Sequence, residues 1–271
     1  MPNGSFFEVE PGIELYYEEL GQGDPLVFVP GWTVPTRSFV HQFSHFSQSH
    51  RVISFDPRSQ GRSTVTLQGN DYATQSADLC KLIDHLKLEK PVVIGWSYGC
   101  LPLWGAVRLR GCAPFRGLVF IDMPPAPVTG QEGDWVEFSI SDAADLYQAL
   151  TTSKGQRELV TAFAQEGLVQ RTLSAEELNW IVGLFTATPH WIAAAYGAAG
   201  LFSNYFEEAQ EVDRSLPSLF FVAEHSKGQA KGYLDRQLPN ARAEFFGGHM
   251  MFWEYPEKFN SALEDFVSGL S

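Results

Sequence analysis

Basic residues are scarce in this chain of 271 residues. Lysine and arginine total 19 against 32 aspartate and glutamate residues, which gives a formal net charge of −13 at pH 7. Proteins that bind nucleic acids need clustered lysine and arginine side chains to neutralise phosphates. The charge balance therefore argues against a nucleic-acid partner.

Long apolar runs are also missing, although 44% of the residues are hydrophobic. No stretch approaches the about 18 uninterrupted apolar residues that a membrane-spanning helix needs. The first twelve residues, MPNGSFFEVEPG, contain no basic region followed by an apolar one, as a secretory leader would. We therefore expect no membrane partner, a cytoplasmic location and one large domain with a substantial core.

Cysteine is too rare to build a disulfide framework. The chain contains three cysteines, which are Cys80, Cys100 and Cys112. Their number is odd and no pair has the C-x-x-C spacing of a zinc or redox site. This pattern predicts three reduced thiols in the core and makes a cysteine nucleophile improbable.

Metal and cofactor motifs are incomplete. His41 and His45 have the spacing of a metal-binding helix, but the glutamate of an H-E-x-x-H motif is missing between them. The glycine pair at residues 21–23 lacks the third glycine and the following helix of a dinucleotide fingerprint. No metal and no cofactor are therefore expected.

Short apolar runs alternate with helical patterns over most of the chain. Residues 5–19 alternate around Pro11-Gly12 and predict an antiparallel hairpin. Continuous apolar runs that are typical of buried parallel strands lie at residues 26–29, 92–94, 118–121 and 219–223, and two further strands are expected at residues 51–55 and 243–246. The order predicts an α/β protein with a mostly parallel sheet and helices on both faces.

The alternation stops in the middle of the chain. Residues from about 134 to 210 contain no convincing strand and read as helices, one of them opened by the capping box at Ser174 to Glu177. We therefore expect a core domain formed by residues 1–126 and 211–271, with a helical cap at 127–210 inserted after the Asp122 strand.

A G-x-S-x-G sequence follows the apolar run at residues 92–94 and leads into a helical pattern. In Gly95-Trp96-Ser97-Tyr98-Gly99, the two glycines allow a sharp turn from strand to helix that exposes the serine. Backbone N–H groups at the start of the following helix favour negative charge beside it. Ser97 is thus the predicted nucleophile.

A serine nucleophile needs a histidine base and a carboxylate that orients the base. His249 follows a late strand after two glycines and is the predicted base. Asp122 ends the strand after the elbow and is the favoured acid. Glu224, which follows the strand at residues 219–223, is the main alternative.

The remaining site residues come from loops at the strand ends and from the cap. The backbone N–H groups of Trp32 and Tyr98 are the predicted oxyanion hole, whereas Asp56 and Arg58 are expected to hold the neighbouring loop. An apolar substrate pocket is expected from large side chains close to the nucleophile and in the cap. The pocket candidates are Trp32, Trp96, Trp135, Phe138, Trp180, Phe185, Trp191 and Met250.

With these residues, the chain resembles the α/β-hydrolase superfamily over essentially its whole length. The motifs are Pro30-Gly31-Trp32, the run DPRSQGRS at residues 56–63, the elbow and Gly247-Gly248-His249. The resemblance implies an α/β-hydrolase fold with an eight-stranded sheet. Dehalogenases and epoxide hydrolases of this superfamily carry an aspartate where this chain has Ser97.

The resemblance leaves more than one function open because this fold hosts many activities. A serine hydrolase that cleaves a small apolar or aromatic ester, lactone or related acyl bond is the favoured hypothesis. Pro30-Gly31-Trp32 and Asp122 are also similar to cofactor-independent 3-hydroxy-4-oxoquinoline 2,4-dioxygenases, which have S-H-G where this chain has Tyr98 after Ser97. A non-catalytic ligand-binding homologue is a third alternative. The expected partner is a small-molecule substrate, and the chain is expected to be a monomer or homodimer.

Overall fold

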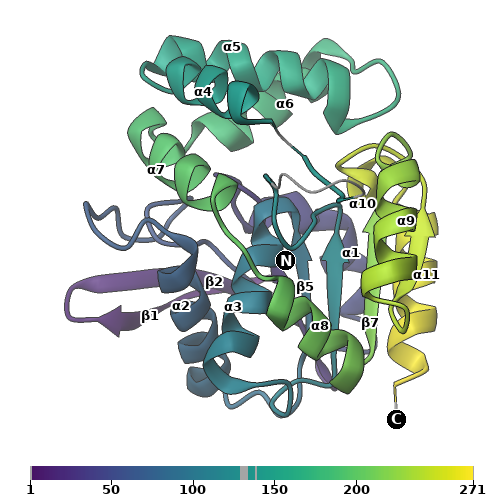
Figure 1. The fold of residues 1–271 in the computed structure, drawn as a ribbon. Coiled ribbons are helices and arrows are strands. Elements are labelled where there is room, and N and C mark those ends of the chain that lie inside the picture. The colour runs from purple at the N-terminus through teal and green to yellow at the C-terminus, as the bar shows by residue number, and fades with distance from the viewer. Residues whose placement is uncertain (1, 129–133, 138, 271) are drawn as a thin grey trace.

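An eight-stranded sheet runs through the computed structural model, which describes residues 2–128, 134–137 and 139–270 (Figure 1). The strands are β1 (Asn3–Glu10), β2 (Ile13–Leu20), β3 (Pro25–Val29), β4 (Arg51–Phe55), β5 (Val92–Trp96), β6 (Gly117–Ile121), β7 (Ser218–Val222) and β8 (Arg242–Phe245). Their order is β1-β2-β4-β3-β5-β6-β7-β8. Strand β2 pairs antiparallel with β1 and β4, and the other pairs are parallel. The predicted fold class is confirmed.

The apolar composition of the central strands explains the layered arrangement. Every residue of β5, β6 and β7 is buried, so both faces of the sheet must be covered by helices. At the sheet edge, β1 and β2 form the predicted hairpin, and Gly12 takes the positive φ of 78° that its turn requires.

Two sets of helices cover the two faces of the sheet. Their side chains belong to two separate apolar clusters, one containing Leu79 and Leu103 and the other Phe43 and Phe259. The first set is α2 (Tyr72–His85), α3 (Leu101–Arg110), α8 (Phe206–Ser215) and α9 (Lys227–Gln237). The second set is α1 (Val40–Phe46), α10 (Met251–Glu254) and α11 (Pro256–Ser268).

A group of helices from the segment predicted to be a cap lies over the carboxyl ends of the strands, and we refer to these helices as the cap (Figure 1). These helices are α4 (Ile140–Ala149), α5 (Ser153–Phe163), the π-helical turn η3 (Ala164–Leu168), α6 (Ala175–Thr186) and α7 (His190–Leu201). The expected capping box opens α6, since Glu177 N donates to Ser174 Oγ at 3.2 Å and Ser174 N donates to Glu177 Oε2 at 2.8 Å.

Helix α8 packs beside the sheet rather than over its strand ends. Its Glu208 accepts hydrogen bonds from the Arg108 guanidinium of α3 at 2.6 and 2.9 Å. The cap boundary placed at residue 210 from the sequence therefore falls inside α8, after the chain has returned to the side of the core. Along the described chain, no helix combines the length and apolar character that crossing a membrane requires.

Candidate active site

Ser97 stands at the turn between β5 and the 3-10 turn η2 (Ser97–Cys100) that leads into α3. Its φ of 54° is in the left-handed region, which gives the turn its sharpness. A Cβ on Gly95 would lie 2.5 Å from the Gly99 carbonyl oxygen, and one on Gly99 would lie 2.5 Å from the Val29 carbonyl oxygen. Both glycines of the motif are thus required by close backbone packing.

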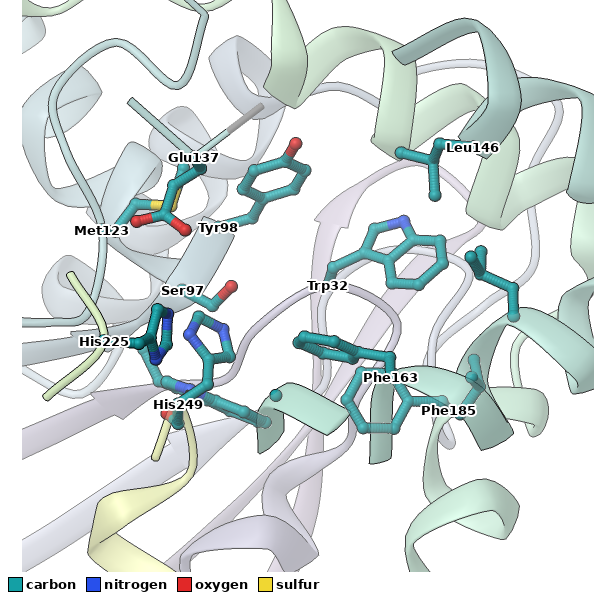
Figure 2. Close-up of a pocket in the computed structure, with 14 residues that line it drawn as sticks. Trp32, Ser97, Tyr98, Met123, Glu137, Leu146, Phe163, Phe185, His225 and His249 are labelled. Carbon is teal, nitrogen blue, oxygen red and sulfur yellow. Dashed lines mark hydrogen bonds between the residues drawn. The ribbon is translucent and has the colours of Figure 1, made fainter. Parts of the chain in front are cut away.

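Asp122 and His249 are hydrogen-bonded to each other. The Nδ1 of His249 lies 2.6 Å from Oδ2 of Asp122, while Oδ1 of Asp122 accepts from the Ala223 N–H at 2.8 Å. In the neutral tautomer whose Nδ1–H donates to this aspartate, the other ring nitrogen is a hydrogen-bond acceptor. Figure 2 shows the imidazole of His249 beside the Ser97 side chain.

Backbone contacts fix the loop that carries His249. The N–H of His249 donates to the Gly167 carbonyl at 3.2 Å, and its own carbonyl accepts from Trp96 Nε1 at 2.8 Å. A Cβ on Gly248 would lie 2.7 Å from the Leu168 carbonyl oxygen, so the loop passes directly against η3. The cap therefore contributes to the placement of the histidine.

The alternative acid, Glu224, lies away from His249. Its carboxylate is exposed and pairs with Lys227 Nζ at 3.0 Å. Its backbone N–H donates to the Gly247 carbonyl at 3.0 Å, which supports the same loop through the main chain. Of the two candidate acids, Asp122 is the one that contacts the histidine.

A cavity of about 180 Å³ lies between these residues and the cap (Figure 2). Ser97 faces it and is only partly covered. The lining residues are Trp32, Trp96, Ser97, Tyr98, Met123, Glu137, Leu146, Leu159, Val160, Phe163, Gly167, Phe185, His225 and His249. Most of these side chains are apolar, which favours an apolar ligand.

The loop after β3 brings Trp32 to the same cavity. A Cβ on Gly31 would lie 3.2 Å from Ser97 Cβ, so the backbone of this loop passes close to the serine. The Trp32 indole Nε1 donates to the Ala193 carbonyl of α7 at 2.8 Å. Of the predicted site residues, Trp32, Trp96, Tyr98 and Phe185 are among those that line the cavity.

The other expected pocket residues lie elsewhere, which corrects that expectation. Trp135 is buried in the core against Phe220, and Met250 is fully buried in the apolar cluster that contains Phe252. Trp180 stacks on Trp253 at a centroid distance of 5.5 Å, and Trp191 is 41% exposed. Phe138 lies outside the described residues.

Several lining residues were not expected from the sequence. Met123 follows Asp122 directly, and Leu159, Val160 and Phe163 share one side of α5, so their spacing is a signal that could have been used. Glu137 and His225 give no such signal. Burial raises the pKa of the Glu137 carboxyl well above its usual range, and the neighbouring Asp122 carboxylate raises it further.

Asp56 and Arg58 hold the loop after β4, as expected. The Asp56 carboxylate accepts from the N–H groups of Thr36 and Arg62, both at 2.8 Å. The buried Arg58 guanidinium makes a bidentate ion pair with Asp78 of α2. Neither side chain lines the cavity.

No cluster of three or more histidine, cysteine, aspartate or glutamate side chains suited to a metal ion occurs within the described ranges. Each cysteine is buried and unpaired. Among the described lining residues, the groups that can take part in proton transfer are Ser97, Tyr98, Glu137, His225 and His249, the last of which is paired with Asp122.

The fold and this strand-end arrangement are those of α/β hydrolases, and residues 26–262 match the sequence profile of the Alpha/beta hydrolase family. The chain belongs to this family. It is 24% identical to the AB hydrolase superfamily protein YisY of Bacillus subtilis, over 97% of this chain and 98% of that protein. It is 31% identical to a soluble epoxide hydrolase of a Corynebacterium species, over 81% of each chain.

Solved structures show the same fold. An esterase from Exiguobacterium antarcticum superposes with a TM-score of 0.89 at 20% identity, covering 98% of this chain and all of that one. A bromoperoxidase from Bacillus anthracis superposes with a TM-score of 0.88 at 19% identity, with the same coverage. Neighbours with different activities thus share one architecture.

Proposed function

We propose that this protein hydrolyses small, largely apolar or aromatic carboxylic esters through a Ser97–His249–Asp122 triad. The observation that carries the proposal is the 2.6 Å contact between His249 Nδ1 and Asp122 Oδ2, beside a serine held at a positive φ. A serine at this position forms an acyl-enzyme, whereas the carboxylate of a dehalogenase or epoxide hydrolase forms an alkyl-enzyme. The esterase among the structural neighbours gives further support.

In the proposed reaction, the unprotonated ring nitrogen of His249 removes the proton from Ser97 Oγ as that oxygen attacks the ester carbonyl carbon. The N–H groups of Trp32 and Tyr98 stabilise the resulting oxyanion. His249 then protonates the departing alkoxide, which leaves the acyl group on Ser97. Water activated by the same histidine cleaves this acyl-enzyme and restores the serine.

The cavity supports the choice of substrate class. Its volume of about 180 Å³ favours a small ester, and its walls include the aromatic rings of Trp32, Phe163 and Phe185. Neither lysine nor arginine is among the described residues that line the cavity, so a carboxylate on the substrate would find no lysine or arginine partner among them. An uncharged ester fits these surroundings.

The test is hydrolysis of p-nitrophenyl acetate, butyrate and benzoate by the wild-type protein and by Ser97→Ala and His249→Ala variants. We expect turnover in the wild type and a loss of roughly 10³-fold or more in both variants. Ser268→Ala, which changes an exposed serine on α11, is the matched control and should keep full activity.

The same preparations should be assayed with an oxygen electrode and a 3-hydroxy-4-oxoquinoline. Oxygen uptake that survives Ser97→Ala but is lost in His249→Ala would contradict the proposal and support cofactor-independent dioxygenase chemistry. Ester hydrolysis that survives Ser97→Ala would exclude the acyl-enzyme.

A further inference from the structure

Glu137 is the one carboxyl among the described lining residues that the proposed mechanism does not use. Its backbone is fixed by a hydrogen bond from its N–H to the Pro127 carbonyl at 3.0 Å. Its Oε1 atom is buried and has no hydrogen-bond partner in the described part of the chain. Figure 2 shows the carboxyl next to Met123 and Tyr98, above Ser97.

The surroundings of Glu137 favour the neutral form of its carboxyl. Burial is the main cause of its raised pKa, the Asp122 carboxylate adds to it, and the Trp135 indole N–H only partly opposes it. The other titratable groups at this end of the cavity are His225, His249 and the buried Tyr98 hydroxyl. A neutral carboxyl offers one hydrogen-bond donor and one acceptor.

The cavity has a polar and an apolar end. In Figure 2, Glu137 and His225 lie on one side of Ser97, whereas Trp32, Phe163 and Phe185 lie on the other. The buried hydroxyl of Tyr98 is also without a hydrogen-bond partner in the described structure. A substrate that spans Ser97 would therefore place unlike groups on the two sides of its scissile bond.

We propose that Glu137 is a specificity-determining residue that binds an uncharged hydroxyl or amide group of the ester, on the side opposite the aromatic rings. A carboxylate on the substrate would lie beside the Glu137 carboxyl, and no lysine or arginine is among the described residues that line the cavity. An ammonium group would bind strongly only if Glu137 lost its proton against the effect of burial. An uncharged group pairs with the neutral carboxyl and satisfies its orphaned oxygen. This inference rests on the proposed ester hydrolysis.

Two pairs of esters test the inference, each pair exchanging a hydroxyl for a methyl group. The acyl side is probed by p-nitrophenyl 3-hydroxybutyrate against 3-methylbutyrate, and the alcohol side by 3-hydroxyphenyl butyrate against 3-methylphenyl butyrate. For the pair that reaches Glu137, we expect the wild type to prefer the hydroxyl ester roughly tenfold in kcat/KM. In Glu137→Met the preference should disappear or reverse.

Glu137→Gln keeps a donor and an acceptor and should retain most of the preference. Glu176→Met, an exposed glutamate on α6, is the matched control and should leave the ratio unchanged. Glu137→Met is expected to melt at the wild-type temperature or above, because it removes an unpartnered buried polar atom. If Glu137→Met does not fold, Glu137→Ala replaces it in the same comparison.

The outcomes separate the two proposals. Hydrolysis that depends on Ser97, with a hydroxyl-to-methyl ratio that is the same in wild type and Glu137→Met for both pairs, overturns the role of Glu137 alone. The proposed role of Glu137 is also overturned if the wild type prefers the methyl ester in both pairs. Absence of Ser97-dependent hydrolysis for all four esters overturns the proposed function, and this inference with it.

Discussion

The indole Nε1–H of Trp32 donates a hydrogen bond to the carbonyl oxygen of Ala193 at an N···O distance of 2.8 Å. One residue belongs to the loop that passes Ser97 and the other to helix α7 of the cap. The bond therefore links the predicted oxyanion loop directly to the segment that covers the cavity.

Trp32→Phe should break this link while keeping an aromatic ring in the cavity. The loss of one part-buried hydrogen bond is expected to lower the free energy of unfolding by about 1 kcal/mol and to raise KM several-fold. Chemical denaturation and ester kinetics measure the two effects. Trp191→Phe, on the exposed side of the same helix, should change neither. Equal behaviour of the two variants would contradict a role for the link.

Asp122→Asn should reduce kcat by roughly 10³- to 10⁴-fold. An asparagine can donate to His249 Nδ1 instead of accepting from it, which favours the wrong tautomer of the imidazole. Glu224→Gln is the matched control, because Glu224 pairs with Lys227 and its loss should leave kcat within twofold. A greater loss in Glu224→Gln than in Asp122→Asn would transfer the positioning role to Glu224.

Gly200→Ala should destabilise the contact between α7 and Tyr98. The added Cβ would lie 2.5 Å from the Tyr98 ring, which is itself packed edge-on against Tyr72 at 5.6 Å. We expect a loss of about 1–3 kcal/mol in the free energy of unfolding. Gly183 lies on the exposed side of α6, where an added Cβ would have no atom within 4 Å. Gly183→Ala should therefore raise the free energy of unfolding by about 0.5–1 kcal/mol. Urea denaturation of both variants checks the contrast.

Asp56 should make stability depend on pH. Burial raises its pKa to about 6, although the N–H groups of Thr36 and Arg62 lower it. Between about pH 4 and 6, the folded protein binds a proton at Asp56 that the unfolded chain has released. The stability that this proton contributes is therefore fully present below about pH 4 and is lost as the pH rises through 6. Relative to Asp56→Asn, the free energy of unfolding of the wild type should fall by about 3 kcal/mol between pH 3.5 and 7.5. Parallel stability curves for the two proteins would contradict this.

Leu146 should control the length of the acyl group. It lines the cavity at Ser97 and also a neighbouring cavity of about 370 Å³ between α4 and α7. Leu146→Ala is expected to join the two and to raise kcat/KM for p-nitrophenyl octanoate over butyrate by roughly tenfold. Leu159→Ala also removes a leucine from the first cavity, but this residue does not line the second, so its effect should be smaller.

The fold and the positions of Ser97, Asp122 and His249 follow from local patterns in the sequence. Continuous apolar runs predict buried strands, and the residue after each run lies at a known edge of a parallel sheet. The glycines around Ser97 and before His249 predict sharp turns, and the structure contains these turns. The sequence favoured Asp122 over Glu224 as the acid, and the geometry adds the direct contact between Asp122 and His249.

The pocket was harder to predict because composition does not show which way a side chain faces. Trp135 and Trp180 are large and aromatic, yet one packs in the core and the other stacks on Trp253. Glu137, in contrast, lines the cavity although no sequence pattern predicts it there. An acidic residue is normally expected at the surface, so its burial in the cavity can be found only from tertiary structure.

The cap enters the chain after β6 and ends before α8 returns it to β7, and these two strands are neighbours in the sheet. Ser97, Asp122 and His249 all lie outside this inserted segment. Helices α4 to α7 could be exchanged for others joined at the same two points only if the contacts of η3 with the His249 loop are kept, because the Gly167 carbonyl accepts from the His249 N–H. Substrate choice can thus be altered through α4 to α7, whether by evolution or by grafting, while η3 keeps the histidine in place.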